Sequence, residues 1–203
     1  MDGADSGTWR QGDGGAVTGP RVGIYGGSFD PPHIGHVLSV AWALSSGNID
    51  EVWVIPTWEH AFGKAHGASF DDRMAMCDLA FAPFRGVTLL DIERELGDVS
   101  RTLHTLEAIR DRHPDAELRL LIGADVIPTV DRWYRWEDVI RIAPPLVVGR
   151  QGYPAPRGCP ISIPNVSSTD VRALLDRAVD PEGLVPTAVI EHIRSHGLYT
   201  GEE

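Results

Sequence analysis

The residues best suited to chemistry gather in one eleven-residue string, Gly26-Gly27-Ser28-Phe29-Asp30-Pro31-Pro32-His33-Ile34-Gly35-His36. The string lies between a β-type run, Arg21 to Tyr25, and an apolar helical run, Val37 to Leu44, so it forms a predicted strand-to-helix turn. Paired glycines let a backbone approach a ligand closely, and the free amides and the dipole at a helix start attract anions. The string therefore indicates a phosphate site, with these candidate binding residues: Gly26, Gly27, Ser28 and Phe29.

Two histidines of the string lie three residues apart at the start of the predicted helix. At this spacing His33 and His36 share one helical face, so both side chains can reach one phosphate. Gly35 between them removes a side chain that would obstruct that phosphate. We predict that His33 and His36 are catalytic and that Gly35 belongs to the phosphate site. A glycine turn with two incidental histidines is the plainer alternative.

A second string, Val166-Ser167-Ser168-Thr169-Asp170-Val171-Arg172, opens a helical run predicted over Val171 to Val179. Hydroxyls and amides at a helix start can hold phosphate, and the guanidinium of Arg172 adds a fixed fork of donors. Simple N-capping by Ser168 or Thr169, with Arg172 in solvent, explains the same residues. The string taken alone leaves both interpretations open.

The elements that position these strings alternate between two periodicities. Short β-type runs are predicted at Arg21 to Tyr25, Glu51 to Ile55, Val87 to Asp91, Leu118 to Ile122 and Leu146 to Gly149. Helical stretches separate these runs. The alternation predicts an α/β fold, a Rossmann-like doubly wound parallel sheet with helices on both faces, which binds ligands beyond the carboxyl ends of its strands.

Two of the intervening helices have apolar stripes and candidate N-caps. The first carries its stripe behind Ser69 and the second behind Ser100, with Pro114 ending the second helix. The stripe residues are Phe70, Met74, Cys77 and Phe81 in the first helix, and Leu103, Leu106 and Ile109 in the second. Cys77 is therefore predicted to pack in the core.

Length and composition are consistent with one enzyme-sized globular domain. The chain has 203 residues, 42% of them hydrophobic and 23% charged, and we predict a flexible glycine-rich tail at 1–20 followed by a single domain at 21–203. No apolar run approaches the length of a membrane span and the first residues do not resemble a signal peptide, so we expect a cytoplasmic protein without membrane contact.

Charge and cysteine content restrict the ligands. The net charge of −11 argues against nucleic acid as a partner, although a local pocket can still bind ATP when Mg²⁺ shares the charge. The two cysteines, Cys77 and Cys159, form no zinc pattern, and we predict no metal-ligating residues in the chain. No GxxxxGK[ST] sequence of a P-loop occurs.

The first string closely resembles the HxGH signature of the nucleotidylyltransferase superfamily. The second is similar to the serine-serine-threonine-x-x-arginine segment with which that superfamily meets the triphosphate. The resemblance favours the phosphate interpretation of the second string. It implies that Ser167, Ser168 and Thr169 bind phosphate and that Arg172 is a third catalytic residue.

Further segments narrow the resemblance to the bacterial nicotinate-nucleotide adenylyltransferase family, over roughly Arg21 to Tyr199. They are Gly123-Ala124-Asp125 with Trp133-Tyr134-Arg135-Trp136, Ser100-Arg101-Thr102-Leu103-His104-Thr105-Leu106, and the close His196-Gly197-Leu198-Tyr199. The resemblance implies that Gly123 and Asp125 hold the ATP side and that Trp133 stacks on a pyridine ring. It also implies that Thr102, Thr105 and Tyr134 lie near the pyridine substituent. Turn capping by Asp125 and simple packing by Trp133 are the alternatives.

The chain departs from the family pattern on the acceptor side. A proline-proline-histidine-lysine loop is replaced by residues 57–64, in which Lys64 either meets the mononucleotide phosphate or is a solvated charge. Arg101 and His104 replace the usual tyrosine and aspartate. These changes make the acceptor less well defined than the reaction.

The resemblance implies transfer of the adenylyl group of ATP to nicotinate mononucleotide, with Mg²⁺ held mainly by the phosphates. The partners would be ATP and a pyridine mononucleotide, with an oligomer possible. Two alternatives stay open. One is an adenylyl- or cytidylyltransferase acting on another acceptor, such as nicotinamide mononucleotide or phosphopantetheine, and the other is a regulator that binds nucleotides without turnover.

Overall fold

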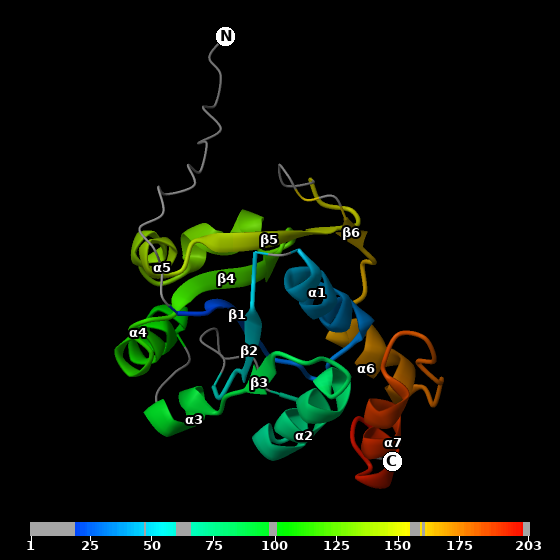
Figure 1. The fold of residues 1–203 in the computed structure, drawn as a ribbon. Coiled ribbons are helices and arrows are strands. Elements are labelled where there is room, and N and C mark those ends of the chain that lie inside the picture. The colour runs from blue at the N-terminus through cyan, green and yellow to red at the C-terminus, as the bar shows by residue number, and fades with distance from the viewer. Residues whose placement is uncertain are drawn as a thin grey trace.

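The computed structural model describes residues 19–46, 48–59, 66–97, 101–154, 159 and 161–200. Six strands form one sheet in the order β3-β2-β1-β4-β5-β6, and all neighbouring strands run parallel (Figure 1). The strands are β1 (Arg21–Gly27), β2 (Glu51–Pro56), β3 (Val87–Leu89), β4 (Glu117–Gly123), β5 (Pro145–Arg150) and β6 (Ser162–Ile163). From β1 the chain adds strands first on one side of the sheet, as β2 and β3, and then on the other side, as β4 to β6. The switch point between β1 and β4 places a ligand crevice at their carboxyl ends.

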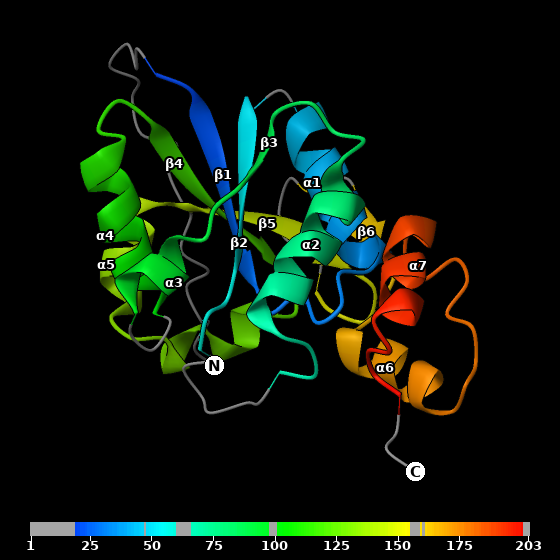
Figure 2. The same cartoon turned by 90° about the horizontal axis from the view of Figure 1, so that it is seen from below.

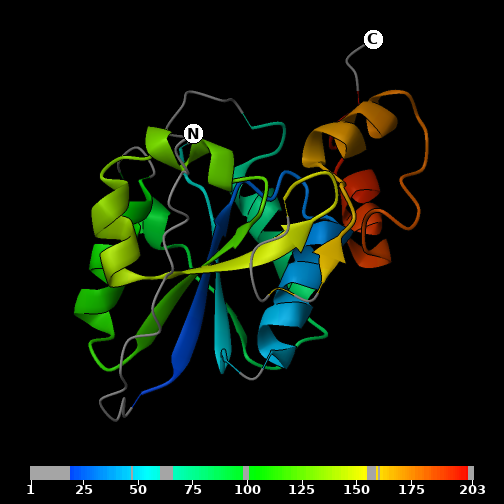
Figure 3. The same cartoon turned by 90° about the horizontal axis from the view of Figure 1, so that it is seen from above.

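Helices cover both faces of the sheet, as predicted (Figure 2). One face carries α1 (Ile34–Ser45), α2 (Phe70–Phe81), α6 (Ser168–Asp176) and α7 (Thr187–Ser195). The other carries α3 (Ile92–Leu96), α4 (Thr102–Arg112), the 3-10 helix η1 (Ile127–Arg132) and α5 (Trp136–Ile142). In the view of Figure 3, β5 and β6 lead from the α5 side toward α1 and α6.

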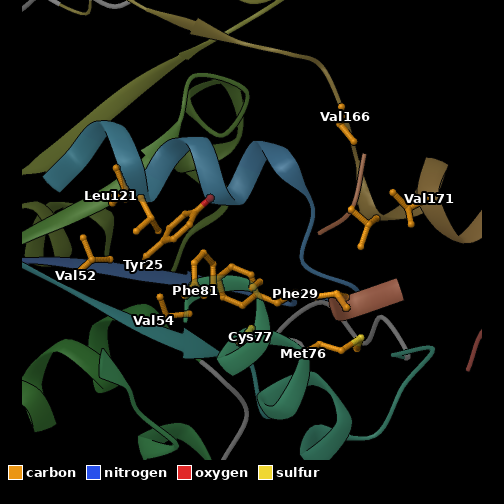
Figure 4. Close-up of a cluster of buried hydrophobic side chains, with 14 of the residues drawn as sticks. Tyr25, Phe29, Val52, Val54, Met76, Cys77, Phe81, Leu121, Val166 and Val171 are labelled. Carbon is orange, nitrogen blue, oxygen red and sulfur yellow. The ribbon is translucent and has the colours of Figure 1, made fainter. Parts of the chain in front are cut away.

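The sheet separates two hydrophobic cores because successive residues of a strand point to opposite faces. In β2, Val52 and Val54 enter the core beneath α1 and α2, while Trp53 and Ile55 enter the core beneath α4 and α5. Figure 4 shows the first core, where Cys77 packs with 0% exposure, as predicted. Strands buried on both faces explain the near-continuous apolar runs in the sequence.

Every predicted strand is confirmed to within two residues at each end. Ser69 is also confirmed as the N-cap of α2, since its Oγ accepts the Asp72 N–H at 3.1 Å. The N-cap predicted for α4 was wrong: the position belongs to Arg101, whose side chain makes no capping hydrogen bond, and Ser100 lies outside the described residues. Sequence patterns did not reveal the short elements α3, α5 and β6.

The start of α6 also differs from the prediction. The helix begins at Ser168 instead of Val171, and its N-cap is Ser167, whose Oγ accepts the Asp170 N–H at 3.1 Å. Ser168 and Thr169 therefore lie inside the first turn, and neither is the N-cap.

Some predictions concern parts of the chain that the structure leaves undescribed. Residues 1–18 of the predicted tail and Lys64 lie outside the described ranges. The division into a tail and a single domain stays a prediction. Of the helices in the described ranges, none has the length and hydrophobicity needed to cross a membrane.

Candidate active site

The two histidines of the first string form a reciprocal cap at the start of α1. Nδ1 of His33 accepts the Gly35 N–H at 3.1 Å, and the His33 N–H donates to Nδ1 of His36, also at 3.1 Å. Their rings stack with centroids 3.8 Å apart. A Cβ at position 35 would lie 2.9 Å from Cε1 of His33. The position of the His33 ring therefore requires a glycine at position 35.

Burial makes both imidazoles weak bases. It lowers the pKa of His33 to about 4, assisted by the positive charge of Arg150. Burial also holds the pKa of His36 well below its usual value, with further contributions from His33 and Arg150. Both rings are therefore neutral at pH 7, and because each Nδ1 accepts a backbone N–H, each proton is on Nε2. The pair offers two neutral N–H donors.

Asp30 connects this turn to three distant segments. Its buried carboxylate accepts the backbone N–H groups of Gly67 and Ala68 at 2.7 and 3.0 Å and the hydroxyl of Tyr199 at 2.8 Å. The guanidinium of Arg172 lies 3.5 Å from the same carboxylate and donates to the Asp30 carbonyl. The position of Arg172 is thus set by the first string.

Ser168 and Thr169 of the second string complete this junction. Ser168 Oγ donates to the Pro31 carbonyl at 2.9 Å, and Thr169 Oγ1 accepts from Arg172 at 3.4 Å. Two strings more than 130 residues apart in sequence therefore meet through direct hydrogen bonds. Their joint contact with phosphate stays a prediction.

The side chain of Phe29 belongs to the core. It is 1% exposed, and its ring packs edge-on to His36 at 4.9 Å. The ring also packs edge-on to Tyr25 and Phe81 at 5.4 and 6.1 Å (Figure 4). The backbone of Phe29 has φ 46°, in the left-handed region that favours glycine. The ring therefore packs against the His36 side chain. Any ligand contact of Phe29 would come from its backbone.

Asp125 follows β4 and pairs with an arginine that sequence patterns did not single out. Arg150 Nη1 donates to Asp125 Oδ2 at 2.6 Å, and Nη2 donates to the Val166 carbonyl. Within the part of the chain that the structure describes, Oδ1 of Asp125 is buried without a hydrogen-bond partner. A Cβ at position 123 would lie 2.3 Å from that oxygen, which accounts for Gly123.

A cavity of about 440 Å³ lies at the carboxyl ends of β1, β2 and β4, within the usual size range of small-molecule sites. It combines the glycine turn with all four predicted acceptor-side residues that the structure describes. Its lining comprises Ile24, Gly26, Gly27, Ser28, Ile55, Thr57, Glu93, Arg101, Thr102, Thr105, Leu106, Leu120, Leu121, Ile122, Arg132, Trp133 and Tyr134.

The outer wall of this cavity is aromatic. Trp133 is half-buried and packs edge-on to Trp136 at 5.5 Å. The ring of Tyr134, 47% exposed, lies 4.6 Å from the Arg101 guanidinium and 5.7 Å from the His104 ring. Both departures from the family pattern in the threonine segment therefore contact the same tyrosine.

A buried carboxylate lies on the inner wall. Glu93 Oε1 accepts the Thr105 hydroxyl at 3.1 Å, and Oε2 accepts the Trp58 N–H at 3.1 Å. Thr105, which we predicted as an acceptor-side contact, lines the cavity but directs its hydroxyl hydrogen to Glu93 or to the Arg101 carbonyl.

Sequence reasoning missed Asp30, Arg73, Glu93 and Arg150 as site residues. Arg73 is 1% exposed and donates to the Ser28 carbonyl at 2.9 Å, so it supports the glycine turn from α2. Two of these residues could have been found from the sequence. Arg73 is a charge inside the apolar stripe between Phe70 and Cys77, and Arg150 directly follows a predicted strand.

The fold and the site together define a class. A parallel sheet in the order 3-2-1-4-5-6, with an HxGH histidine pair beside its switch point, is the arrangement of a nucleotide-binding α/β transferase. Comparison with known proteins agrees with this class. Residues 24–174 match the family model described as cytidylyltransferase-like.

The chain is 43% identical to a probable nicotinate-nucleotide adenylyltransferase of Anaeromyxobacter sp. (strain K), covering 90% of this chain and 98% of that one. It is 31% identical to nicotinate-nucleotide adenylyltransferase of Bacillus subtilis, covering 88% and 98%. Among solved structures, Plasmodium falciparum nicotinic acid mononucleotide adenylyltransferase complexed with NaAD matches with a TM-score of 0.77 at 21% identity, covering 89% and 98%. The chain belongs to the cytidylyltransferase-like family and, within it, to the nicotinate-nucleotide adenylyltransferases.

Proposed function

We propose that the protein transfers the adenylyl group of ATP to nicotinate mononucleotide, giving deamido-NAD and pyrophosphate in NAD biosynthesis. One observation carries the proposal: the glycine turn that leads into His33 lines the same cavity as the acceptor-side residues Thr102, Trp133 and Tyr134. A phosphate held at the turn and a pyridine held at the aromatic wall would then belong to one bound molecule. The relatives named above support the same reaction.

In this reaction an oxygen of the mononucleotide 5′-phosphate forms a bond to the α-phosphorus of ATP. The bond from that phosphorus to the α–β bridging oxygen breaks, and pyrophosphate leaves with that oxygen. No covalent enzyme intermediate is needed, so catalysis rests on positioning and on donors aimed at the transferring group. We assign these donors to Nε2–H of His33, Nε2–H of His36 and the guanidinium of Arg172.

The charges of the site suit a nucleotide that arrives with a cation. The histidines are neutral, Arg150 is paired with Asp125, and Arg172 is paired with Asp30. These groups therefore offset little of the charge of a triphosphate. We propose Mg²⁺ as the cation, held mainly by the phosphates and neutralising charge there, with the buried Asp125 Oδ1 as a candidate protein ligand.

The acceptor wall favours an acid over an amide. Two arginines, Arg101 and Arg132, line the cavity with one carboxylate, Glu93, whose oxygens already accept hydrogen bonds from the protein. The guanidinium of Arg101 in this lining would stabilise a nicotinate carboxylate, which accepts hydrogen bonds only, more than a neutral amide. We therefore propose nicotinate mononucleotide as the preferred acceptor. Cytoplasmic location, self-association and the lack of a nucleic-acid partner stay predictions.

The direct test is pyrophosphate release with ATP and a panel of acceptors: nicotinate mononucleotide, nicotinamide mononucleotide and phosphopantetheine. We expect kcat/KM to be highest for nicotinate mononucleotide, by at least about tenfold, because this ratio measures differential binding of the transition states. A preference for another acceptor would refute the acceptor assignment alone. Nucleotide binding without pyrophosphate release for any acceptor would favour a regulator.

A further inference from the structure

A cluster of potential metal ligands lies outside the lining of the cavity, where α7 packs against α2 (Figure 2). Asp72 belongs to the first turn of α2, His192 to the last turn of α7, and His196 follows four residues later as the C-cap. One ligand atom from each of the three side chains lies within 4.8 Å of the others. None of these residues takes part in the proposed transfer reaction.

The spacing of two of the three ligands is close to that in a metal site. Nε2 of His192 and Oδ1 of Asp72 are 3.3 Å apart, and bonds of about 2.0 to 2.2 Å to a tetrahedral zinc ion place ligand atoms about 3.3 to 3.6 Å apart. The two imidazoles stack with centroids 4.0 Å apart and planes 22° apart, so one ring must turn before both can direct a nitrogen at the same ion. His196 is exposed, so its side chain can close the remaining distance without disturbing the core.

Neighbouring groups already orient the candidate ligands. Ser69 Oγ donates to Oδ2 of Asp72 at 2.6 Å, which leaves Oδ1 directed at His192. Nδ1 of His196 lies 2.9 Å from the His192 carbonyl, so a hydrogen bond there leaves Nε2 of His196 as the ligand atom. Such outer contacts, which fix ring orientation and tautomer, are typical of metal-ligating histidines.

We propose that Asp72, His192 and His196 bind a divalent ion of the zinc type, with water completing its coordination. Two imidazoles and one carboxylate are a donor set that suits Zn²⁺ and differs from the all-oxygen sets preferred by Mg²⁺ and Ca²⁺. The ion joins α7 to α2. Because the chain just beyond α7 carries Tyr199, whose hydroxyl donates to Asp30 at 2.8 Å, the ion also stabilises the support of the catalytic turn.

The test uses the full chain, freed of metal by chelator and then studied without nucleotides or Mg²⁺, because triphosphates bind Zn²⁺ themselves. Titration calorimetry with ZnCl₂ should give one ion per chain. His196→Gln should weaken binding at least about tenfold, since even changes to outer contacts weaken metal sites by about 10- to 100-fold. Because His196 is exposed, this variant should keep the fold, which circular dichroism checks.

His113→Gln is the matched control, because His113 is also an exposed histidine just after a helix but lies outside the cluster. It should bind Zn²⁺ like the unmodified chain. In hydrogen exchange, amides of residues 187–199 should exchange more slowly with Zn²⁺ than without it, and His196→Gln should remove this difference. Absence of Zn²⁺ binding, or binding that His196→Gln leaves unchanged, would overturn the proposal. The latter result would place the ion elsewhere, for example on His33 and His36.

Discussion

The phosphate side of the site, around Asp30 and His33, is buried and joined to distant segments, whereas the acceptor wall, around Arg101 and Tyr134, is exposed. Asp30 and His33 are 3% and 4% exposed, and Tyr134 is 47% exposed. A change on the buried side leaves unpaired polar groups in the interior, while a change on the wall alters only what the wall contacts. We therefore expect changes on the buried side to affect the reaction and changes on the exposed wall to affect the choice of acceptor.

The largest effect of breaking the buried side should come from Asp30→Ala. This change leaves two backbone N–H groups and the Tyr199 hydroxyl without their acceptor, and it removes the carboxylate that pairs with Arg172. We expect the free energy of unfolding to fall by about 3–5 kcal/mol, as for other buried pairs that lose one partner.

Urea denaturation measures this loss, and Asp50→Ala is its matched control. Asp50 pairs with Arg21 at 2.7 Å, but both side chains are well exposed, so its loss should lower stability by about 1 kcal/mol or less. Equal losses for the two variants would contradict the contrast between buried and exposed contacts.

The next largest effect should come from testing the roles of the two ring nitrogens of His36 separately. In His36→Asn the amide oxygen can replace Nδ1 as acceptor of the His33 N–H, but the Nε2 donor is gone. We expect kcat to fall by about 10²- to 10³-fold, the size of a lost transition-state donor, with little change in melting temperature.

His36→Gln provides the converse variant, because its amide can reach the Nε2 position and lacks the acceptor at Nδ1. It should keep more activity and lose more stability than His36→Asn. Steady-state kinetics and thermal unfolding of the two variants compare these roles. A near-normal kcat for His36→Asn would remove His36 from the catalytic residues.

A smaller effect should appear as a pH dependence of stability. The pKa of His33 is about 4 in the folded chain and about 6.5 when unfolded. The unfolded state therefore takes up the proton first as pH falls, so folding stability decreases between pH 6.5 and 4. From pH 7 to pH 5, His33 should contribute a loss of about 2 kcal/mol.

His33→Asn isolates this contribution, because asparagine is a good N-cap and does not titrate in this range. Its unfolding free energy should fall by about 2 kcal/mol less than that of the unmodified chain over the same pH interval. Parallel stability curves would show that His33 is not held neutral by burial.

The smallest effect should come from the acceptor wall. Arg101→Tyr restores the tyrosine usual in the family and removes a cation from the cavity lining. We expect the ratio of kcat/KM for nicotinate over nicotinamide mononucleotide to fall about tenfold, or about 1.4 kcal/mol, with unchanged stability. Arg110→Tyr, on the same helix but outside the cavity lining, should leave the ratio unchanged. An unchanged ratio in Arg101→Tyr would show that other groups select the acid.

The sequence by itself determined the fold class and five strands, and it predicted the glycine-histidine turn as the catalytic site. These features are local: glycines, a helix start and two histidines three residues apart indicate an anion site whatever surrounds them. Resemblance to a known family then indicated Thr102, Trp133 and Tyr134, and the structure brings all three to one cavity.

Only the tertiary structure decided which groups support that turn. Asp30 meets Gly67, Arg172 and Tyr199 across 37, 142 and 169 residues of sequence, and Asp72 meets His192 across 120. No periodicity encodes such pairs, because they depend on how helices of different segments pack on one sheet face. The same packing removes water from His33 and His36, so their neutral state follows from burial.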